Sequence, residues 1–285
     1  MNGLRSLGGT LLIIAAIALS GAAQAQSAPA RPSPAAKGKQ AVSLEPKAMD
    51  VLRAMSQALT GAQSMAFTAV STYENPTRVG PALAYSTRSE ILMQRPDKLR
   101  VVTLGDGPAA EYYYDGRTLT AYAPAEKLAA VAPAPPSIDA MLENAFKSAA
   151  IYFPFADVVG SDPYKLISDD LVKAFYVGQS KVVDDTTTDV LALVSNEMFM
   201  QLWVGSNDRL PRKMRVIYRG DPLRLRHELT LSNWKLDPVV AADAFASLNA
   251  QNAEKIAFAA PQSASAARKP APAKSKAKPA KTAQP

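Results

Sequence analysis

The hydrophobic pattern of this chain changes near residue 63, and from there to about residue 236 it mostly repeats every two residues. In "AEYYYDGRTLTAYAP" (110–124) successive side chains point to opposite faces, which is typical of β-strands. The Asp-Gly pair inside this segment indicates a tight hairpin turn, because glycine adopts positive φ at little cost. About ten such segments follow one another, so the pattern predicts one large antiparallel sheet.

Two segments with helical spacing accompany these strands. The first, residues 44–64, has apolar residues on one face and ends near Gly61. The second begins at Ser137, a favoured N-cap residue, and continues with apolar residues three and four positions apart. The proline-broken segment 151–172 is expected to form covering loops with short helical turns. A strongly curved sheet with helices packed on one face accommodates all of these segments.

The N-terminal segment, Met1–Ala25, has the features of a secretory signal peptide. Arg5 precedes an apolar core of nine residues, and Ala23-Gln24-Ala25 provides a cleavage site with small residues. A transmembrane anchor would need about 20 apolar residues. Because the chain has no cysteine, it offers neither a lipid-acceptor thiol nor disulfides. The sequence therefore predicts a soluble periplasmic protein that is not a lipoprotein.

Composition divides the rest of the chain into three parts. Residues 26–44 are expected to be a flexible Ala/Pro leader, residues 45–261 one folded domain, and residues 262–285 a disordered basic Lys/Ala/Pro tail. The folded part holds all 25 acidic residues and 22 of the 32 basic ones, so its net charge is −3. The formal charge of +7 for the whole chain therefore comes from its two ends.

The basic tail has two interpretations. It either tethers the protein to an anionic membrane or cell-wall surface, or it is simply solvated. A nucleic-acid partner is not expected, since the folded part has no basic stripe with stacking aromatics and the protein is exported. We expect a monomer.

The tyrosine-rich hairpin raises the question of what its two faces contact. Tyr112 and Tyr114 point to one face and Tyr113 to the other. Because both faces of this and other strands carry apolar or aromatic residues, two interpretations remain. Either helices cover the second face and these residues form an ordinary core, or the concave face surrounds an apolar ligand. A slip of one residue in register would exchange the two faces.

Catalysis has little support in the sequence. His227 is the only histidine, no Ser-x-Gly elbow lies near it, and cysteine is absent. A histidine-based metal site is excluded by count, and the acidic segments 168–170 and 184–189 lack a calcium-loop pattern. We therefore expect no enzymatic activity, no metal and no cofactor.

Several motifs resemble a family of predicted periplasmic proteins of unknown function. The motifs are "RPDKLRV" (95–101), "YYYDGRTLTAYAP" (112–124), "PSIDAMLENAF" (136–146), "FPFADVV" (153–159), "MQLWVGSNDRLPRKMRVIYRG" (200–220), "LTLSNWKLDP" (229–238) and "AEKIAF" (253–258). Their order is also similar to the LolA/LolB lipoprotein-carrier fold, an unclosed antiparallel half-barrel with helices as a lid over an apolar cavity for acyl chains. The resemblance implies an α+β fold in which the N-terminal helix and the mid-chain helical insert cover the concave face.

Two positions bear on how far this resemblance extends. The family usually has a histidine on the strand that corresponds to Thr188–Val194, and this chain has none there. In the lipoprotein carrier, a strand arginine holds the lid or the cargo, and Arg100 matches it. Arg100 either faces the apolar concavity, where it must find acceptors, or points outward from its strand.

The resemblance implies a non-enzymatic binding protein that holds a lipid, another apolar ligand or a lipidated protein between sheet and helices. The residues expected to line this cavity are Phe67, Arg100, Tyr112, Tyr114, Tyr122, Met141, Phe146, Met200 and Trp203. The alternative is a cell-envelope scaffold with a filled core, which acts through its basic tail. A hydrolase is a third interpretation, which turnover lost on His227→Ala would support.

Overall fold

The computed structural model describes residues 42–259, so the predictions for residues 1–41 and 260–285 lie outside the described residues. Within the described range the strands form one sheet. In chain order they are β1 (Ser43–Leu44), β2 (Ser64–Asn75), β3 (Leu83–Gln94), β4 (Lys98–Gly105), β5 (Ala110–Tyr114), β6 (Thr118–Ala123), β7 (Leu128–Pro133), β8 (Leu171–Ser180), β9 (Thr188–Ser195), β10 (Met198–Gly205), β11 (Pro211–Tyr218), β12 (Arg226–Leu236) and β13 (Glu254–Ile256). The helices are α1 (Pro46–Gly61), α2 (Ile138–Ala149), α3 (Ala156–Val159), α4 (Pro163–Ser168) and α5 (Leu248–Gln251).

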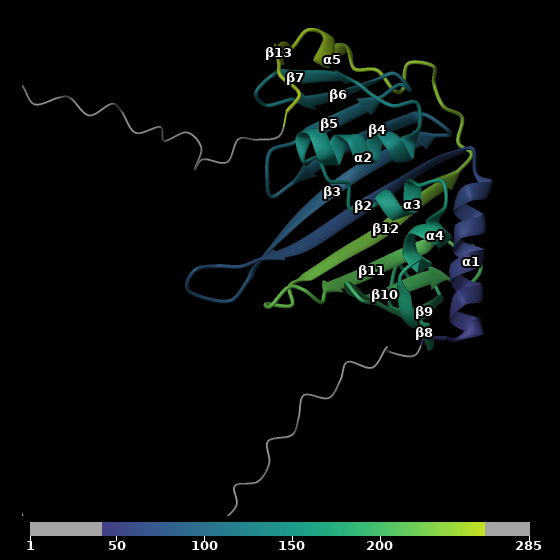
Figure 1. The fold of residues 1–285 in the computed structure, drawn as a ribbon. Coiled ribbons are helices and arrows are strands. Elements are labelled where there is room, and N and C mark those ends of the chain that lie inside the picture. Colours follow the sequence, from purple (N-terminus) through teal and green to yellow (C-terminus); the bar gives the residue numbers. More distant parts are fainter. Residues whose placement is uncertain (1–41, 260–285) are drawn as a thin grey trace, which may run out of the picture. The chain divides into compact units, whose positions relative to one another are not determined.

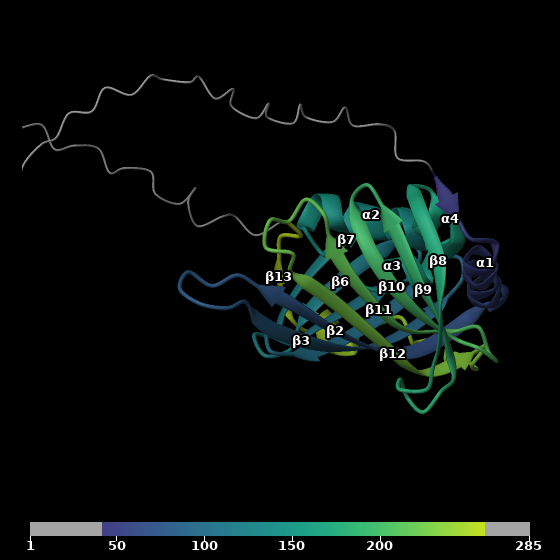
Figure 2. The ribbon, with the colours of Figure 1, turned by 90° about the horizontal axis from the view of Figure 1, so that it is seen from below.

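The sheet is open and strongly curved. Its strand order is β1-β8-β9-β10-β11-β12-β2-β3-β4-β5-β6-β7-β13, and neighbours are antiparallel except in the pairs β1–β8 and β7–β13. The strands form a trough whose concave side carries α2, α3 and α4 (Figures 1 and 2). This confirms the predicted α+β class with a curved, unclosed antiparallel sheet.

The strand count differs from the expected number of about ten, because the sheet has thirteen strands. The two outermost strands, β1 and β13, are two and three residues long and add to the edges in parallel. Segments this short cannot show a period of two, so sequence alternation does not reveal them. Strand β1 also places Ser43–Leu44 in the sheet, although the sequence predicted a flexible leader there.

Helix α1 forms where the first amphipathic segment predicts it. Pro46 is its first residue, a position where the missing N–H costs nothing. Its apolar stripe is buried and joins the core of the sheet. The buried residues are Ala48, Met49, Val51, Leu52, Met55, Ser56 and Leu59. The helix runs beside α4 and β8 and closes one end of the trough (Figure 1).

Helix α2 follows the predicted N-cap. The Ser137 hydroxyl accepts a hydrogen bond from the Ala140 N–H at 3.3 Å, and Lys147 lies in the last turn. Ala150 ends the helix in the left-handed conformation with φ of 54°. Its apolar face points to the sheet, and α2 lies in front of β4 and β5 on the concave side, as Figure 1 shows.

The β5–β6 hairpin has the turn that Asp-Gly predicts. Gly116 has a positive φ of 92°, and a Cβ there would lie 2.6 Å from the Asp97 carboxylate. The Asp115 carboxylate accepts hydrogen bonds from the N–H groups of Arg117 and Thr118. The turn therefore sets the register of the two strands.

No helix in the described range is long and apolar enough to cross a membrane.

Candidate ligand-binding site

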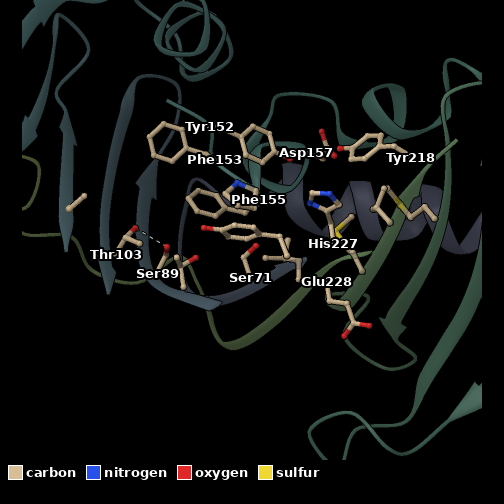
Figure 3. A pocket seen from close by; sticks show the side chains of 18 of the residues that line it. Ser71, Ser89, Thr103, Tyr152, Phe153, Phe155, Asp157, Tyr218, His227 and Glu228 are labelled. Atoms are coloured by element: carbon tan, nitrogen blue, oxygen red, sulfur yellow. Dashed lines mark hydrogen bonds between the residues drawn. The ribbon is translucent and has the colours of Figure 1, made fainter. Parts of the chain in front are cut away.

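A cavity of about 520 Å³ lies between the concave sheet and residues 150–157, toward the end of the trough away from α1. Its floor carries hydroxyl groups from three neighbouring strands. Figure 3 shows Ser71, Ser89 and Thr103 below the roof residues Tyr152, Phe153 and Phe155. The floor residues are Ser71, Thr87, Ser89 and Thr103. The Ser89 and Thr103 hydroxyls are hydrogen-bonded to each other at 2.9 Å. This end of the trough is thus partly polar, whereas the α1 end is apolar.

One wall of the cavity is made of methionines and branched aliphatic residues. Met200 pairs with Val216 across β10 and β11, and Met214 pairs with Leu229 across β11 and β12. Directly opposite residues in adjacent strands share a face, so these side chains line the cavity together with Met198. Methionine side chains are flexible and polarizable, which lets such a wall adapt to different apolar shapes.

The roof is held to the sheet by aromatic contacts. The ring of Phe155 lies 5.9 Å from that of Phe67 on β2, in an edge-to-face arrangement. The ring of Phe153 lies 5.1 Å from that of Tyr112 on β5, also edge-to-face. Such pairs stabilise a contact by about 0.5–1.5 kcal/mol beyond the buried area. The proline-broken segment thus becomes an ordered cover, as its apolar composition predicts.

Polar aromatic residues surround one side of the cavity. The rings of Tyr218 and His227 contact each other edge-to-face at 5.3 Å, and Tyr73 lies opposite His227 in the sheet. Desolvation is the main cause that raises the pKa of the Tyr152 hydroxyl, and the nearby Tyr218 and Asp157 side chains raise it further. Tyr152 lines the same cavity as these two residues, although it is 62% exposed to solvent.

Asp157 is the charged residue of the roof. It lies on α3 and borders the cavity, and burial raises the pKa of its carboxyl above the usual value. Among the described residues it has no ion-pair or side-chain hydrogen-bond partner. A partly desolvated carboxylate without a partner is unfavourable, so the ionised Asp157 side chain lowers the stability of the ligand-free protein.

Asp157→Asn is expected to raise the melting temperature at about pH 7 and to leave it nearly unchanged at about pH 3. The folded protein binds the Asp157 proton more tightly than the unfolded chain does. Stability therefore falls as the pH rises from the unfolded pKa through the folded one. Thermal unfolding at both pH values measures the difference. A lower melting temperature of the variant at neutral pH would contradict the described environment.

Of the nine residues expected to line the cavity, Tyr112 and Met200 border it, and the other seven do not. Phe67, Tyr114 and Met141 point into the same concave space and are fully packed there. They lie nearer to α1, where helices fill the trough. The two sequence interpretations, a filled core and an open cavity, therefore describe different ends of the same concave face.

Arg100, Tyr122 and Trp203 were expected in the cavity, and this expectation is wrong because they lie on the outer face. Arg100 is directly opposite Tyr113, which alternation places on the face away from Tyr112. Tyr122 packs in a separate small cluster under α5. Trp203 is three positions from Met200 on β10, so the two residues must point to opposite faces.

Phe146 was also expected in the cavity and lies outside it. It is 58% exposed on α2. It borders a separate apolar hollow of about 260 Å³ together with Leu142 and Ile151. The helical spacing predicted that Phe146 belongs to the apolar face of α2. The residues of this face that pack on the sheet include Met141 and Ala145, and Phe146 lies beside them.

Several cavity residues were missed by sequence reasoning. The charged residues Arg88 and Glu90 mark the outer face of β3, so alternation would have assigned Thr87 and Ser89 to the concave face. The roof residues had no comparable signal, because the segment 150–157 has no regular period. In the described part of the chain, no group of three or more His, Cys, Asp or Glu is placed to hold a metal ion.

Residues 48–259 match the family described as "Predicted periplasmic protein (DUF2092)". The chain belongs to this family. The family and the periplasmic localisation predicted from the sequence are thereby confirmed. A comparison with curated protein sequences gives no significant match.

Solved structures with a similar fold are distant in sequence. LprF from Mycobacterium bovis is 15% identical, with 72% of this chain and 100% of LprF covered and a TM-score of 0.46. MucB is 18% identical, with 71% of this chain but only 63% of MucB covered and a TM-score of 0.43. The LolA superfamily protein NE2245 from Nitrosomonas europaea is 14% identical, with 70% and 97% covered and a TM-score of 0.31. No functional conclusion follows at these values.

Proposed function

We propose that this periplasmic protein binds a lipid or another apolar or amphipathic molecule in the cavity under residues 150–157 and does not convert it chemically. The observation that carries the proposal is the cavity itself, whose volume is about 520 Å³. Binding sites for small molecules typically have volumes of about 300–1,000 Å³ and mainly apolar linings with a few polar groups.

The distribution of side chains supports an amphipathic ligand. The methionine wall and the roof rings offer apolar contact on two sides, with Met200 and Phe155 among them. The hydroxyl floor and the tyrosines offer hydrogen bonds at the other positions. A ligand with an apolar body and a polar end would bury both parts favourably, because each meets groups of its own kind.

We further propose that the basic tail, residues 262–285, tethers the protein to an anionic membrane or cell-wall surface. The tail contains six Lys or Arg residues and no acidic residue. Near an anionic lipid surface each basic residue contributes about 1 kcal/mol. In this arrangement the tail holds the protein at the surface, and the cavity binds the ligand.

Ala110→Trp is expected to weaken ligand binding by at least about tenfold, because the indole would occupy cavity volume. Ala110 lies on β5 beside Thr103 and lines the cavity. The neutral dye N-phenylnaphthylamine, whose fluorescence rises in apolar surroundings, measures the affinity. In parallel, lipid mass spectrometry on natively purified protein identifies a co-purifying ligand.

The matched control is Ala84→Trp. Ala84 is exposed on the outer face of β3, opposite Glu74, so the same substitution there should leave dye affinity unchanged. Circular dichroism verifies that both variants are folded. A wild-type protein that carries no ligand and does not bind the dye would refute the proposed function.

A further inference from the structure

We propose that the cavity selects amphiphiles whose polar end is positively charged, such as an amine or a quaternary ammonium group. This inference rests on the proposed function and specifies the ligand class of the same site. It follows from the charges and aromatic rings around the cavity rather than from its volume.

The charges at the cavity are unbalanced. No Lys or Arg is among the residues that line it, whereas Asp157 and Glu228 are. Glu228 is neutralised by Lys213 at 3.0 Å and by Arg215 at 3.6 Å. Figure 3 shows the Glu228 side chain directed away from the roof, below the sheet. Asp157 therefore remains as the carboxylate without a counter-ion.

Aromatic residues surround this carboxylate. Figure 3 shows Asp157 in the roof with Tyr152 and Tyr218 on its two sides and His227 below. Tyrosine faces attract cations through the ring quadrupole, also at sites that are partly exposed to solvent. A carboxylate among tyrosine rings is thus complementary to an ammonium group, which gains both a charge partner and ring contacts.

The same arrangement disfavours anionic amphiphiles. The carboxylate of a fatty acid would lie near Asp157 with no basic side chain in the lining to compensate. Like charges in a partly desolvated site repel strongly, and such repulsion is a common basis of specificity. A neutral amphiphile would use the Ser71 and Thr87 hydroxyls and would be affected little by Asp157.

Isothermal titration with three ligands of equal chain length tests the inference. We expect decyltrimethylammonium to bind at least about tenfold more tightly than decanoate at about pH 8 and low salt, with decanol between them. Asp157→Asn should remove most of the preference for the cation over the anion, measured as the ratio of the two affinities. Asp170→Asn is the matched control, because Asp170 is exposed, does not line the cavity, and has the same charge.

The possible outcomes separate this inference from the proposed function. Equal binding of cation and anion, or equal effects of Asp157→Asn and Asp170→Asn, would overturn the charge selectivity while the cavity remains a ligand site. If none of the three ligands and no neutral dye binds to the wild-type protein, the proposed function itself fails.

Discussion

Phe155→Ala is expected to destabilise the protein by about 3–5 kcal/mol, the range observed for buried aromatic residues. Phe155 is 1% exposed and contacts the rings of Phe67 and Phe153. Removal of its ring would leave an empty volume beside the existing cavity and would detach the roof from the sheet. Urea unfolding, followed by circular dichroism, gives the change in the free energy of unfolding.

Phe146→Ala is the matched control for this prediction. The Phe146 side chain is 58% exposed on α2, so its truncation should change the free energy of unfolding by less than about 0.5 kcal/mol. Similar losses for Phe155→Ala and Phe146→Ala would contradict the described packing of the roof. If Phe146→Ala abolished dye binding, the ligand would have to reach the separate hollow on α2.

Leu52→Ala is expected to cost about 2–5 kcal/mol, because it removes a side chain from the centre of the α1 stripe. Leu52 is 0% exposed and belongs to the same apolar core as Met65 and Leu171. Alanine is a better helix former than leucine, so a loss of stability would report the lost packing and not the helix propensity. The midpoint of urea unfolding measures this loss of stability.

The control for Leu52→Ala is Leu248→Ala. Leu248 is the first residue of α5 and is 77% exposed, so its truncation should have an effect within about 0.5 kcal/mol. Leu52 lies on α1, at the other end of the trough from the cavity. Dye affinity of the folded Leu52→Ala variant should therefore remain close to that of the wild-type protein. A marked loss of affinity would show that the two ends are coupled.

Local signals in the sequence predicted much of the fold. The apolar spacing of the first segment indicated α1, Ser137 indicated the start of α2, and the Asp-Gly pair indicated the β5–β6 turn. These signals depend on residues a few positions apart. Alternation also placed Tyr112 and Tyr114 on one face, which the register confirms.

Strand alternation excludes two of the residues expected in the cavity. Met200 and Trp203 lie on one strand at an odd separation, so both could not line the same cavity. Arg100 alternates with the buried residues Leu99 and Val101, so its side chain points to the outer face. Among the three residues on the outer face, Tyr122 needed the tertiary structure, because its side chain is covered by α5 from a distant part of the chain.

The sequence by itself therefore determined the elements, the class of the sheet and the face of most strand residues, because each depends on periodicity and turn chemistry between near neighbours. The tertiary structure alone decided where the concave face is filled and where it is open. That depends on how far α1 and residues 150–157 extend over the sheet, and on contacts such as Phe155 with Phe67, which are distant in sequence. A hydrophobic pattern records that a side chain faces inward, but it does not record whether another segment occupies the space in front of it.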